Sequence, residues 1–225
     1  MCGRFNVIDN PGLQQLLRDL GIDLGLPEAS NIAPTEAVAL IRNDESGRRM
    51  DAARWWLTPS WAPRVEQKYA MFNARSETLA SSRAFKRPFA SQRGIVPMSS
   101  FIEWRAQEGG KQPWLITSES GALAVAALWD VWCGDGEPLL SCTLVTTAAA
   151  KLFEPWHKRM PVLLDADDRD RWLDNDHPIA PGDPVFANRL REPLLLSPLS
   201  KAVGNARNKD PALMQSAGET VRLAA

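Results

Sequence analysis

The sequence predicts an α+β fold: a single domain of curled, mostly antiparallel β-sheets with a barrel-like core, flanked by short helices. Short segments rich in Leu, Val, Ile, Trp and Thr recur along the chain, a composition typical of β-strands. They alternate irregularly with short helical segments, unlike regular βαβ units. The 225 residues contain no internal repeat, low-complexity tract or linker. We therefore expect residues 1–225 to form one domain.

The first helix, residues 10–21, has the clearest boundaries. Asn10 can cap it, Pro11 suits its first turn, and Gly21 ends it. Its leucines form one apolar stripe. After it we expect a turn at 31–35, a strand at 38–42, a polar loop at 43–47 and a strand at 53–57.

A loop interrupted by prolines, residues 58–63, holds Trp61 away from the regular elements, either as a lid over the core or as an exposed aromatic. Residues 73–78 lead into a short helix capped by Ser76. A broken apolar strand at 94–105 carries Glu103. Further on we expect strands at 114–118, 123–132, 139–147, 162–164 and 194–196, and helices at 148–156 and 167–173.

Composition narrows the class of protein. Hydrophobic residues make up 44% of the chain and charged residues 24%, which is ordinary for a soluble globular protein. No apolar run approaches the ~20 residues of a membrane span, and no signal peptide is recognisable. The three cysteines form no CxxC pair. We therefore expect a cytoplasmic monomer with no membrane contact, metal, disulfide or cofactor.

The net charge of −1 argues against nucleic-acid binding through bulk positive charge but allows a local basic groove. The most basic stretch contains Arg83, Lys86, Arg87 and Arg93, interleaved with Phe85 and Phe89. A basic run is usually a solvated face, but interleaved cations and aromatic rings also suit a phosphate backbone.

Cys2 follows the initiator methionine, and its small side chain permits removal of Met1. The chain would then begin with an α-amine and a thiol on adjacent carbons, groups that titrate near ~8 and ~8.5. Together they can condense with an aldehyde, because the amine forms an imine and the sulfur closes a five-membered thiazolidine ring. The alternative is a frayed terminus, which a lone cysteine without partners would be.

Two side chains are candidate partners of Cys2. His157 lies at a junction of predicted elements, where a side chain can be aimed into a cleft, whereas His177 lies in a turn and is assigned to the surface. Glu103 stands between two large apolar residues. It could point to water, but if it points inward, desolvation raises its pKa toward the range useful for proton transfer. A Cys, a His and a Glu together suit acid–base assisted covalent chemistry.

Several motifs occur in a fixed order along the chain. They are Cys2-Gly3-Arg4-Phe5, Asn31-Ile32-Ala33-Pro34, Asn73-Ala74-Arg75-Ser76-Glu77-Thr78, Phe101-Ile102-Glu103-Trp104, Val145-Thr146-Thr147, His157-Lys158-Arg159-Met160-Pro161 and Val203-Gly204-Asn205. Over nearly its whole length the chain closely resembles the SOS-response-associated peptidase family, whose members process abasic sites in DNA.

The resemblance implies a reaction. Cys2 would be the nucleophile that forms a covalent thiazolidine with the ring-opened sugar of an abasic site in single-stranded DNA and so shields the lesion. Asn73 would hold the N-terminal amine or the sugar. Glu103 would move protons during ring opening and imine formation, and His157 would be a second acid–base group. Release of the protein's own Met1 accounts for the peptidase label.

The resemblance also implies a DNA-binding groove. Its phosphate-contacting cations would be Arg4, Arg75, Arg83 and Arg159, with Asn31 and Thr146 lining the groove and Trp61 stacking on the base next to the lesion. Three places depart from the family pattern: Ile102 replaces an aromatic residue before the Glu-Trp pair, Met98-Ser99-Ser100 stands where a small acidic-glycine turn is common, and Ala62 replaces an aromatic neighbour of Trp61.

Two other functions are compatible with these residues. A thiol peptidase could use Cys2, His157 and Glu103 on protein substrates. A module that only binds single-stranded DNA would need neither Cys2 nor Glu103. The basic and aromatic stretch favours DNA, because a peptidase has no need of so many phosphate-binding cations.

Overall fold

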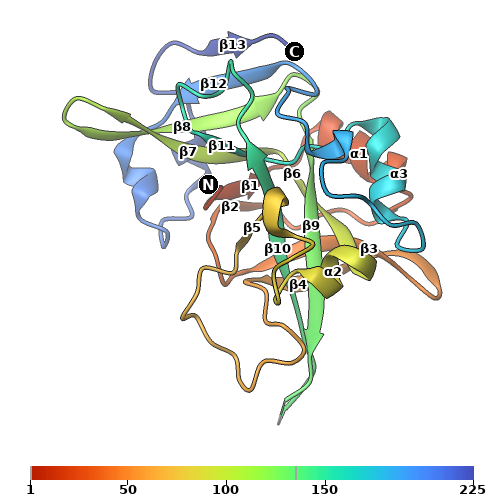
Figure 1. The fold of residues 1–225 in the computed structure, drawn as a ribbon. Coiled ribbons are helices and arrows are strands. Elements are labelled where there is room, and N and C mark those ends of the chain that lie inside the picture. Colours follow the sequence, from red (N-terminus) through yellow and green to blue (C-terminus); the bar gives the residue numbers. More distant parts are fainter. Residues whose placement is uncertain (1, 135) are drawn as a thin grey trace.

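Two curved β-sheets make up most of the structure, a computed structural model that describes residues 2–134 and 136–225 (Figure 1). The first sheet contains β1 (Phe5–Val7), β2 (Ala29–Ile32), β7 (Ser100–Gln107), β8 (Gly110–Ser118), β12 (Leu194–Pro198) and β13 (Val221–Leu223). Its strand order is β13-β12-β8-β7-β1-β2, and all neighbouring pairs are antiparallel. The N-terminal strand therefore lies inside this sheet, between β7 and β2.

The second sheet curls into a nearly closed ring. It contains β3 (Ala37–Asp44), β4 (Gly47–Trp55), β5 (Asn73–Arg75), β6 (Arg93–Met98), β9 (Leu123–Trp132), β10 (Leu139–Ala148) and β11 (Arg159–Pro161). The order is β11-β10-β4-β3-β6-β9, and β9 also pairs with β10, which closes the ring. Only β4 and β5 run parallel to β10 among the described pairs. The predicted fold of curled, mostly antiparallel sheets with a barrel-like core is confirmed.

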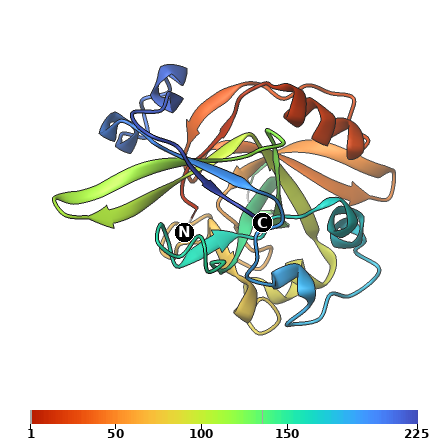
Figure 2. The same ribbon diagram turned by 90° about the horizontal axis from the view of Figure 1, so that it is seen from above.

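Short helices flank the sheets. They are α1 (Pro11–Asp19), α2 (Lys86–Ser91) and α3 (Ala166–Leu173), with 3₁₀ helices η1 (Ser76–Thr78), η2 (Pro184–Phe186), η3 (Lys201–Gly204) and η4 (Pro211–Met214). Seen from above, α1 and α3 lie on one side of the molecule and the β7–β8 hairpin extends from the other (Figure 2).

The first helix begins and ends where the sequence predicts. The Oδ1 atom of Asn10 accepts a hydrogen bond from the Leu13 amide at 3.0 Å, which caps α1. Leu16 and Leu17 are buried with Leu13 along the apolar stripe. Gly21 then takes a positive φ of 67°, a conformation that ends the helix and favours glycine.

The apolar core joins the N-terminal strand to the ring. Phe5 on β1 packs edge-on against Trp55 on β4, with ring centroids 5.0 Å apart. Trp55 in turn packs edge-on against Phe72, 6.1 Å away. Trp55 Nε1 also donates a hydrogen bond to the Phe72 carbonyl at 2.9 Å. These contacts fix Phe5, three residues after Cys2, relative to Phe72, which directly precedes Asn73.

Two predicted elements are wrong around Pro155. The expected helix at 148–156 is a series of turns, in which the Phe153 amide donates to the Ala150 carbonyl at 2.8 Å and the Trp156 amide to the Phe153 carbonyl at 3.0 Å. Pro155 lacks an amide donor and disfavours the α conformation of the residue before it, so a regular helix cannot continue.

The strand expected at 162–164 is also displaced, since β11 covers Arg159–Pro161. Residues 162–164 are extended but cross from one partner to another. The Val162 amide donates to Val145 on β10, and the Leu164 amide donates to Ala124 on β9, each at 2.9 Å. The segment is thus a bridge across the ring rather than a strand of one ladder.

Three boundaries also differ from the predictions. Residues 43–47 are mostly strand, because β3 and β4 pair up to Asp44 opposite Gly47. Polar side chains are compatible with the solvent face of such a hairpin. β4 begins earlier than the strand predicted at 53–57, and it ends at Trp55 rather than at residue 57. Ser76 begins η1 instead of capping it, and Arg75 precedes that helix without a side-chain cap.

Candidate active site

Cys2 is fully buried immediately before β1. Its carbonyl oxygen accepts a hydrogen bond of 2.8 Å from Nδ2 of Asn73. Asn73 begins β5, which runs parallel to β10 with Asn73 opposite Leu144. The ring therefore holds the first residues of the chain through a side chain fixed on a short strand.

Glu103 lies on β7 and its side chain points inward, where 2% of the residue is exposed. Burial raises the pKa of Glu103, and the charge of His157 partly opposes that rise. Burial also raises the pKa of the Cys2 thiol, and the charge of Glu103 raises it further. The thiol, the carboxyl and the imidazole therefore lie within electrostatic reach of one another.

β7 brings Glu103 to Cys2 because it pairs directly with β1. Phe5 stands opposite Phe101, and the Ile102 amide donates to the Arg4 carbonyl at 2.9 Å. The Arg4 carbonyl also lies 3.8 Å from the Cys2 sulfur. Cys2 is two residues before Arg4, and Glu103 directly follows Ile102, so this pairing brings the thiol and the carboxyl toward each other.

His157 is held by the backbone that follows it. Its Nδ1 atom lies 2.9 Å from the Arg159 carbonyl oxygen and 3.0 Å from the Arg159 amide nitrogen. These contacts fix the imidazole through one nitrogen. Trp156 before it packs edge-on against Trp114 with centroids 5.7 Å apart. The turn that replaces the expected helix thus positions the imidazole.

Arg159 is half of an ion pair. Its guanidinium donates to both carboxylate oxygens of Glu77, at 2.5 and 3.0 Å, and this pairing lowers the pKa of Glu77. It also donates to the Thr146 carbonyl at 2.7 Å. Thr146 is buried beneath it, and its hydroxyl donates to the Ala74 carbonyl at 3.3 Å. No local sequence pattern indicates that Glu77 and Arg159, both inside motifs, pair with each other.

Arg4 is bound to a C-terminal segment, residues 203–209. Its guanidinium donates to Asn31 Oδ1 at 2.7 Å and to the carbonyls of Val203 and Gly204 at 3.1 and 3.2 Å. Asn31 is buried, and its Nδ2 donates to the carbonyls of Val203, Asn205 and Asn208. Asn31 and Thr146 thus lie behind Arg4 and Arg159 instead of lining an open groove.

Trp61 is 48% exposed on its loop, so it is no lid over the core. The guanidinium of Arg83 lies 4.0 Å from the centre of its ring. Arg75 is exposed at the end of β5. Arg93, by contrast, is fully buried and bonded to backbone carbonyls that include those of Trp172 and Phe89. Arg93 therefore does not belong to a phosphate-binding face.

The described residues offer no obvious metal centre or membrane segment. Among residues 2–134 and 136–225, no three His, Cys, Asp or Glu side chains gather into a group that could hold a metal ion. No helix in the same ranges is long and apolar enough to cross a membrane.

The strand geometry defines a class of site: a buried thiol near the N-terminus, flanked by a buried carboxyl on the first sheet and by an imidazole, and held to the curled ring through Asn73. The family model described as SOS response associated peptidase (SRAP) matches residues 1–206, and the chain belongs to this family.

Relatives of the chain support this membership. It is 34% identical over 229 residues to the abasic site processing protein YoqW of Bacillus subtilis (strain 168), covering 96% of this chain and all of that protein. Identity to YoaM of the same organism, also described as an abasic site processing protein, is 38% over 181 residues, or 77% of this chain and 79% of YoaM. Abasic site processing protein YedK of Escherichia coli (strain K12) is 29% identical, over 96% of this chain and 99% of YedK.

A solved structure shares the fold. A crystal structure of a protein from Bacteroides thetaiotaomicron superposes with a TM-score of 0.79 at 19% identity, over 96% of this chain and 100% of that one. The two proteins therefore share the same fold over nearly the whole of this chain.

Proposed function

We propose that this protein captures abasic sites in single-stranded DNA as a covalent thiazolidine on Cys2. The observation that carries the proposal is the juxtaposition of the Cys2 thiol with the buried Glu103 carboxyl, beside a Cys2 backbone held by Asn73. The membership of abasic site processing proteins in the same family supports the choice of substrate.

The chemistry begins with a proton on Glu103. Because burial raises its pKa, Glu103 holds a proton at a higher pH than an ordinary carboxyl does. An abasic sugar is in equilibrium with a small open-chain aldehyde fraction. The α-amine of Cys2 adds to that aldehyde, and Glu103 protonates the carbinolamine hydroxyl, which leaves as water and gives a protonated imine beside the ionised Glu103.

Ring closure returns the proton. The Cys2 sulfur adds to the imine carbon, forming the C–S bond as the C=N bond becomes single. The thiol proton passes to the ionised Glu103 and the ring nitrogen is left as an amine, so atoms and charge balance. A thiol with a raised pKa remains S–H until this step, and Glu103 is the nearby group that can accept its proton. We assign His157 the role of a second acid–base group.

The reaction requires a free amine on Cys2. Met1 lies outside the described residues, and its removal is part of the proposal. A chain that retains Met1 has its Cys2 nitrogen in a peptide bond and cannot form the imine. Mass spectrometry of the cross-linked species should therefore show a protein lacking the mass of methionine.

DNA contacts complete the proposal. We assign phosphate binding to Arg4, Arg75, Arg83 and Arg159, and base stacking to Trp61. Because Asn31 and Thr146 are buried, we assign them the role of positioning Arg4 and Arg159. We further propose that residues 1–225 act as one domain and as a monomer in the cytoplasm, where thiols stay reduced.

A denaturing gel tests the reaction. Abasic and intact single-stranded oligonucleotides are incubated with wild-type protein and with Cys2→Ala. We expect a shifted band only for the abasic strand and only with Cys2. Binding without a covalent band would instead indicate a DNA-binding module. Cleavage of unrelated peptides without DNA would indicate a thiol peptidase.

A further inference from the structure

A cavity lies beside the loop that carries Trp61. It has a volume of about 360 Å³, which falls in the range of small-molecule sites, ~300–1,000 Å³. Most of its lining is apolar, from Leu57, Pro59, Trp61, Tyr69, Met71 and Ala84. None of the catalytic candidates lines it, but two of the DNA-binding candidates, Trp61 and Arg83, do.

Two aromatic side chains of this cavity face solvent. Trp61 is 48% exposed and Tyr69, the single tyrosine of the chain, is 68% exposed. Exposed rings around a hollow are typical of a binding site, because they offer apolar area that the folded protein leaves uncovered. Their flat faces suit another flat ring.

Cations accompany both rings. The guanidinium of Arg83 lies 4.0 Å from the centre of the Trp61 ring, and the Lys68 ammonium lies 5.6 Å from that of Tyr69. A third cation, Arg64, is paired with Glu66. An apolar hollow with cations at its aromatic rim matches a nucleotide, whose base is flat and whose phosphate is negative.

The Trp61 side of the cavity is already fixed in place. The Ser60 amide donates to the buried carboxylate of Asp130 at 2.8 Å. Trp132 Nε1 donates to the Ala62 carbonyl at 2.7 Å. These bonds hold the loop to β9, so a ligand need not order it, and affinity gains from that preorganisation.

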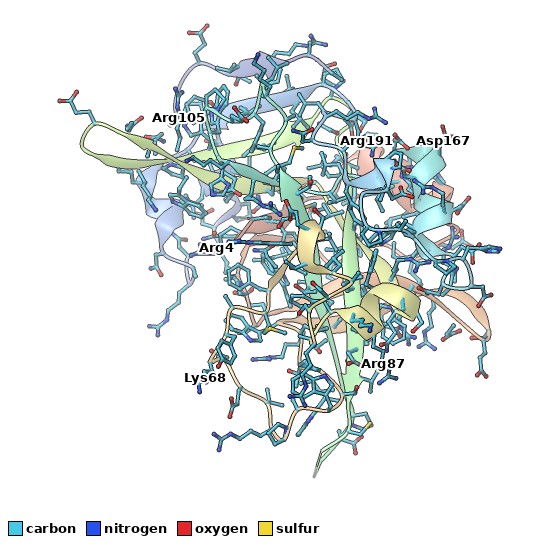
Figure 3. The ribbon with its side chains drawn as sticks, in the orientation of Figure 1. Arg4, Lys68, Arg87, Arg105, Asp167 and Arg191 are labelled. Atoms are coloured by element: carbon cyan, nitrogen blue, oxygen red, sulfur yellow. The ribbon has the colours of Figure 1, made fainter. Side chains whose placement is uncertain are left out.

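The same loop leads into the candidate active site. Its chain continues through Met71 and Phe72 to Asn73, which holds the Cys2 carbonyl. Figure 3 shows Lys68 at the outer edge of this loop and Arg4 on the same side of the view. A DNA strand with its lesion at Cys2 therefore has the cavity near its path.

We propose that Tyr69 is a second stacking surface of this cavity, beside the one already assigned to Trp61, and that it holds an unstacked nucleobase of the DNA strand near the lesion. The inference rests on the proposed function for its ligand. A base next to a missing base has lost one stacking neighbour, so it leaves the stack at a lower energetic cost. Tyr69 thus supplies a second aromatic surface, in a chain that has Ala62 beside Trp61.

A double-mutant cycle in non-covalent binding tests the proposal. The probes are single-stranded oligonucleotides with a tetrahydrofuran lesion, which has no aldehyde, and a second base removed at each flanking position in turn. Fluorescence anisotropy gives the Kd for wild type and Tyr69→Ala. We expect one flanking base whose removal weakens wild-type binding about five- to a hundredfold, the range of a single stacked base. In Tyr69→Ala the same removal should have a clearly smaller effect, because only the Trp61 side of the cavity is then left to contact the base.

Matched variants separate stacking from folding. Tyr69→Phe keeps the ring and should retain sensitivity to that base. Leu24→Ala, another exposed apolar side chain at 65%, should behave as wild type. The proposal is overturned if base removal weakens Tyr69→Ala and wild type equally, or if no flanking base matters. Because these probes cannot react, either result is independent of the Cys2 cross-linking assay.

Discussion

At the scale of single residues, Glu103 shows how burial creates reactivity. A carboxyl at an ordinary position on a two-sided strand would be ionised at neutral pH. Here it is inside, between β1 and β8, and desolvation raises its pKa. The sequence already raised this possibility, since Glu103 lies between two large apolar residues. The inward orientation of the Glu103 side chain is seen only in the structure, where β7 lies between β1 and β8.

A pH dependence follows from Glu103. We expect the cross-linking rate to fall as pH rises through its raised pKa, because the proton donor is then lost. Glu103→Gln should lower the rate about 10²- to 10⁴-fold and remove this limb of the profile. Initial rates of band formation across pH check both. An unchanged limb in Glu103→Gln would assign it to another group.

The stability of the fold gives an independent readout of the same pKa. The native state binds the Glu103 proton more tightly than the unfolded chain, so this group lowers the free energy of unfolding as pH rises from ~4.3 to the native pKa. Glu103→Gln should lack that loss and be the more stable protein above this window. Urea denaturation at several pH values measures the difference.

Asn73 acts on the backbone of the nucleophile, not on the sulfur. Asn73→Ala removes the 2.8 Å bond to the Cys2 carbonyl. We expect a cross-linking rate about two- to tenfold lower or more, since one net hydrogen bond is worth ~0.5–1.5 kcal/mol. Asn43→Ala is the matched control, because Asn43 makes a similar 3.0 Å bond to the Leu173 carbonyl, away from Cys2. Equal losses in both variants would indicate a general effect on folding.

At the scale of elements, η1 and β11 are linked by the Glu77–Arg159 pair. The pair spans 82 residues of sequence and leaves the Arg159 charge partly neutralised. A carboxylate beside a phosphate-binding arginine weakens DNA binding, because it competes for the same donors. We therefore expect the pair to moderate the contribution to DNA affinity that we propose for Arg159.

The salt dependence of DNA binding tests this link. Arg159→Ala should lower the slope of log K against log salt by about 0.7, the value for one phosphate on a single strand. Glu77→Gln should tighten binding, because Arg159 is then free to face phosphate. Arg171→Ala is the control, since Arg171 pairs with Asp168 on α3 and with Asp183, the N-cap residue of η2. A slope unchanged in Arg159→Ala would remove it from the phosphate contacts.

Local sequence signals predicted some elements well and others poorly. The Asn10 cap, the leucine stripe and Gly21 defined α1 because all three act within one helix. The helix expected at 148–156 does not form, because Pro155 interrupts the apolar pattern that predicted it. The strand expected at 162–164 is displaced to β11 for a different reason. The position of β11 is set by its pairing with β10, which no local pattern indicates.

At the scale of the whole molecule, the sequence motifs identify candidate site residues, but they do not indicate which of these side chains are accessible and which are buried supports. Cys2 and Glu103 lie within electrostatic reach of each other, because β1, which follows Cys2, pairs with β7, which carries Glu103. Asn31 and Thr146 were placed with the groove, yet both are buried. Whether a polar side chain faces a ligand or supports another residue depends on segments that are far away in the sequence. For Asn31 that segment is residues 203–209, and no local pattern indicates the contact.

The clearest case is the closure of the N-terminal region by residues 203–209. Nδ2 of Asn31 donates to carbonyls at three positions of that segment, at 3.0 to 3.1 Å. Asn31 itself has a φ of 53°, which asparagine tolerates better than most residues. Lys209 adds a bond of 2.8 Å to the Asn31 carbonyl. One side chain thus connects segments about 170 residues apart and supports Arg4 as well.

Loss of this contact should affect stability and DNA binding together. Asn31→Ala removes three hydrogen bonds to backbone carbonyls, and we expect the free energy of unfolding to fall by about 1–3 kcal/mol. Residues 203–209 should be cut faster in limited proteolysis, and DNA affinity should fall because Arg4 loses its Oδ1 partner at 2.7 Å. Asn43→Ala again serves as the control, with one carbonyl bond in place of three. If Asn31→Ala unfolds like wild type and segment 203–209 stays protected, then Lys209 and Arg4 suffice to hold it, and Asn31 acts only on DNA.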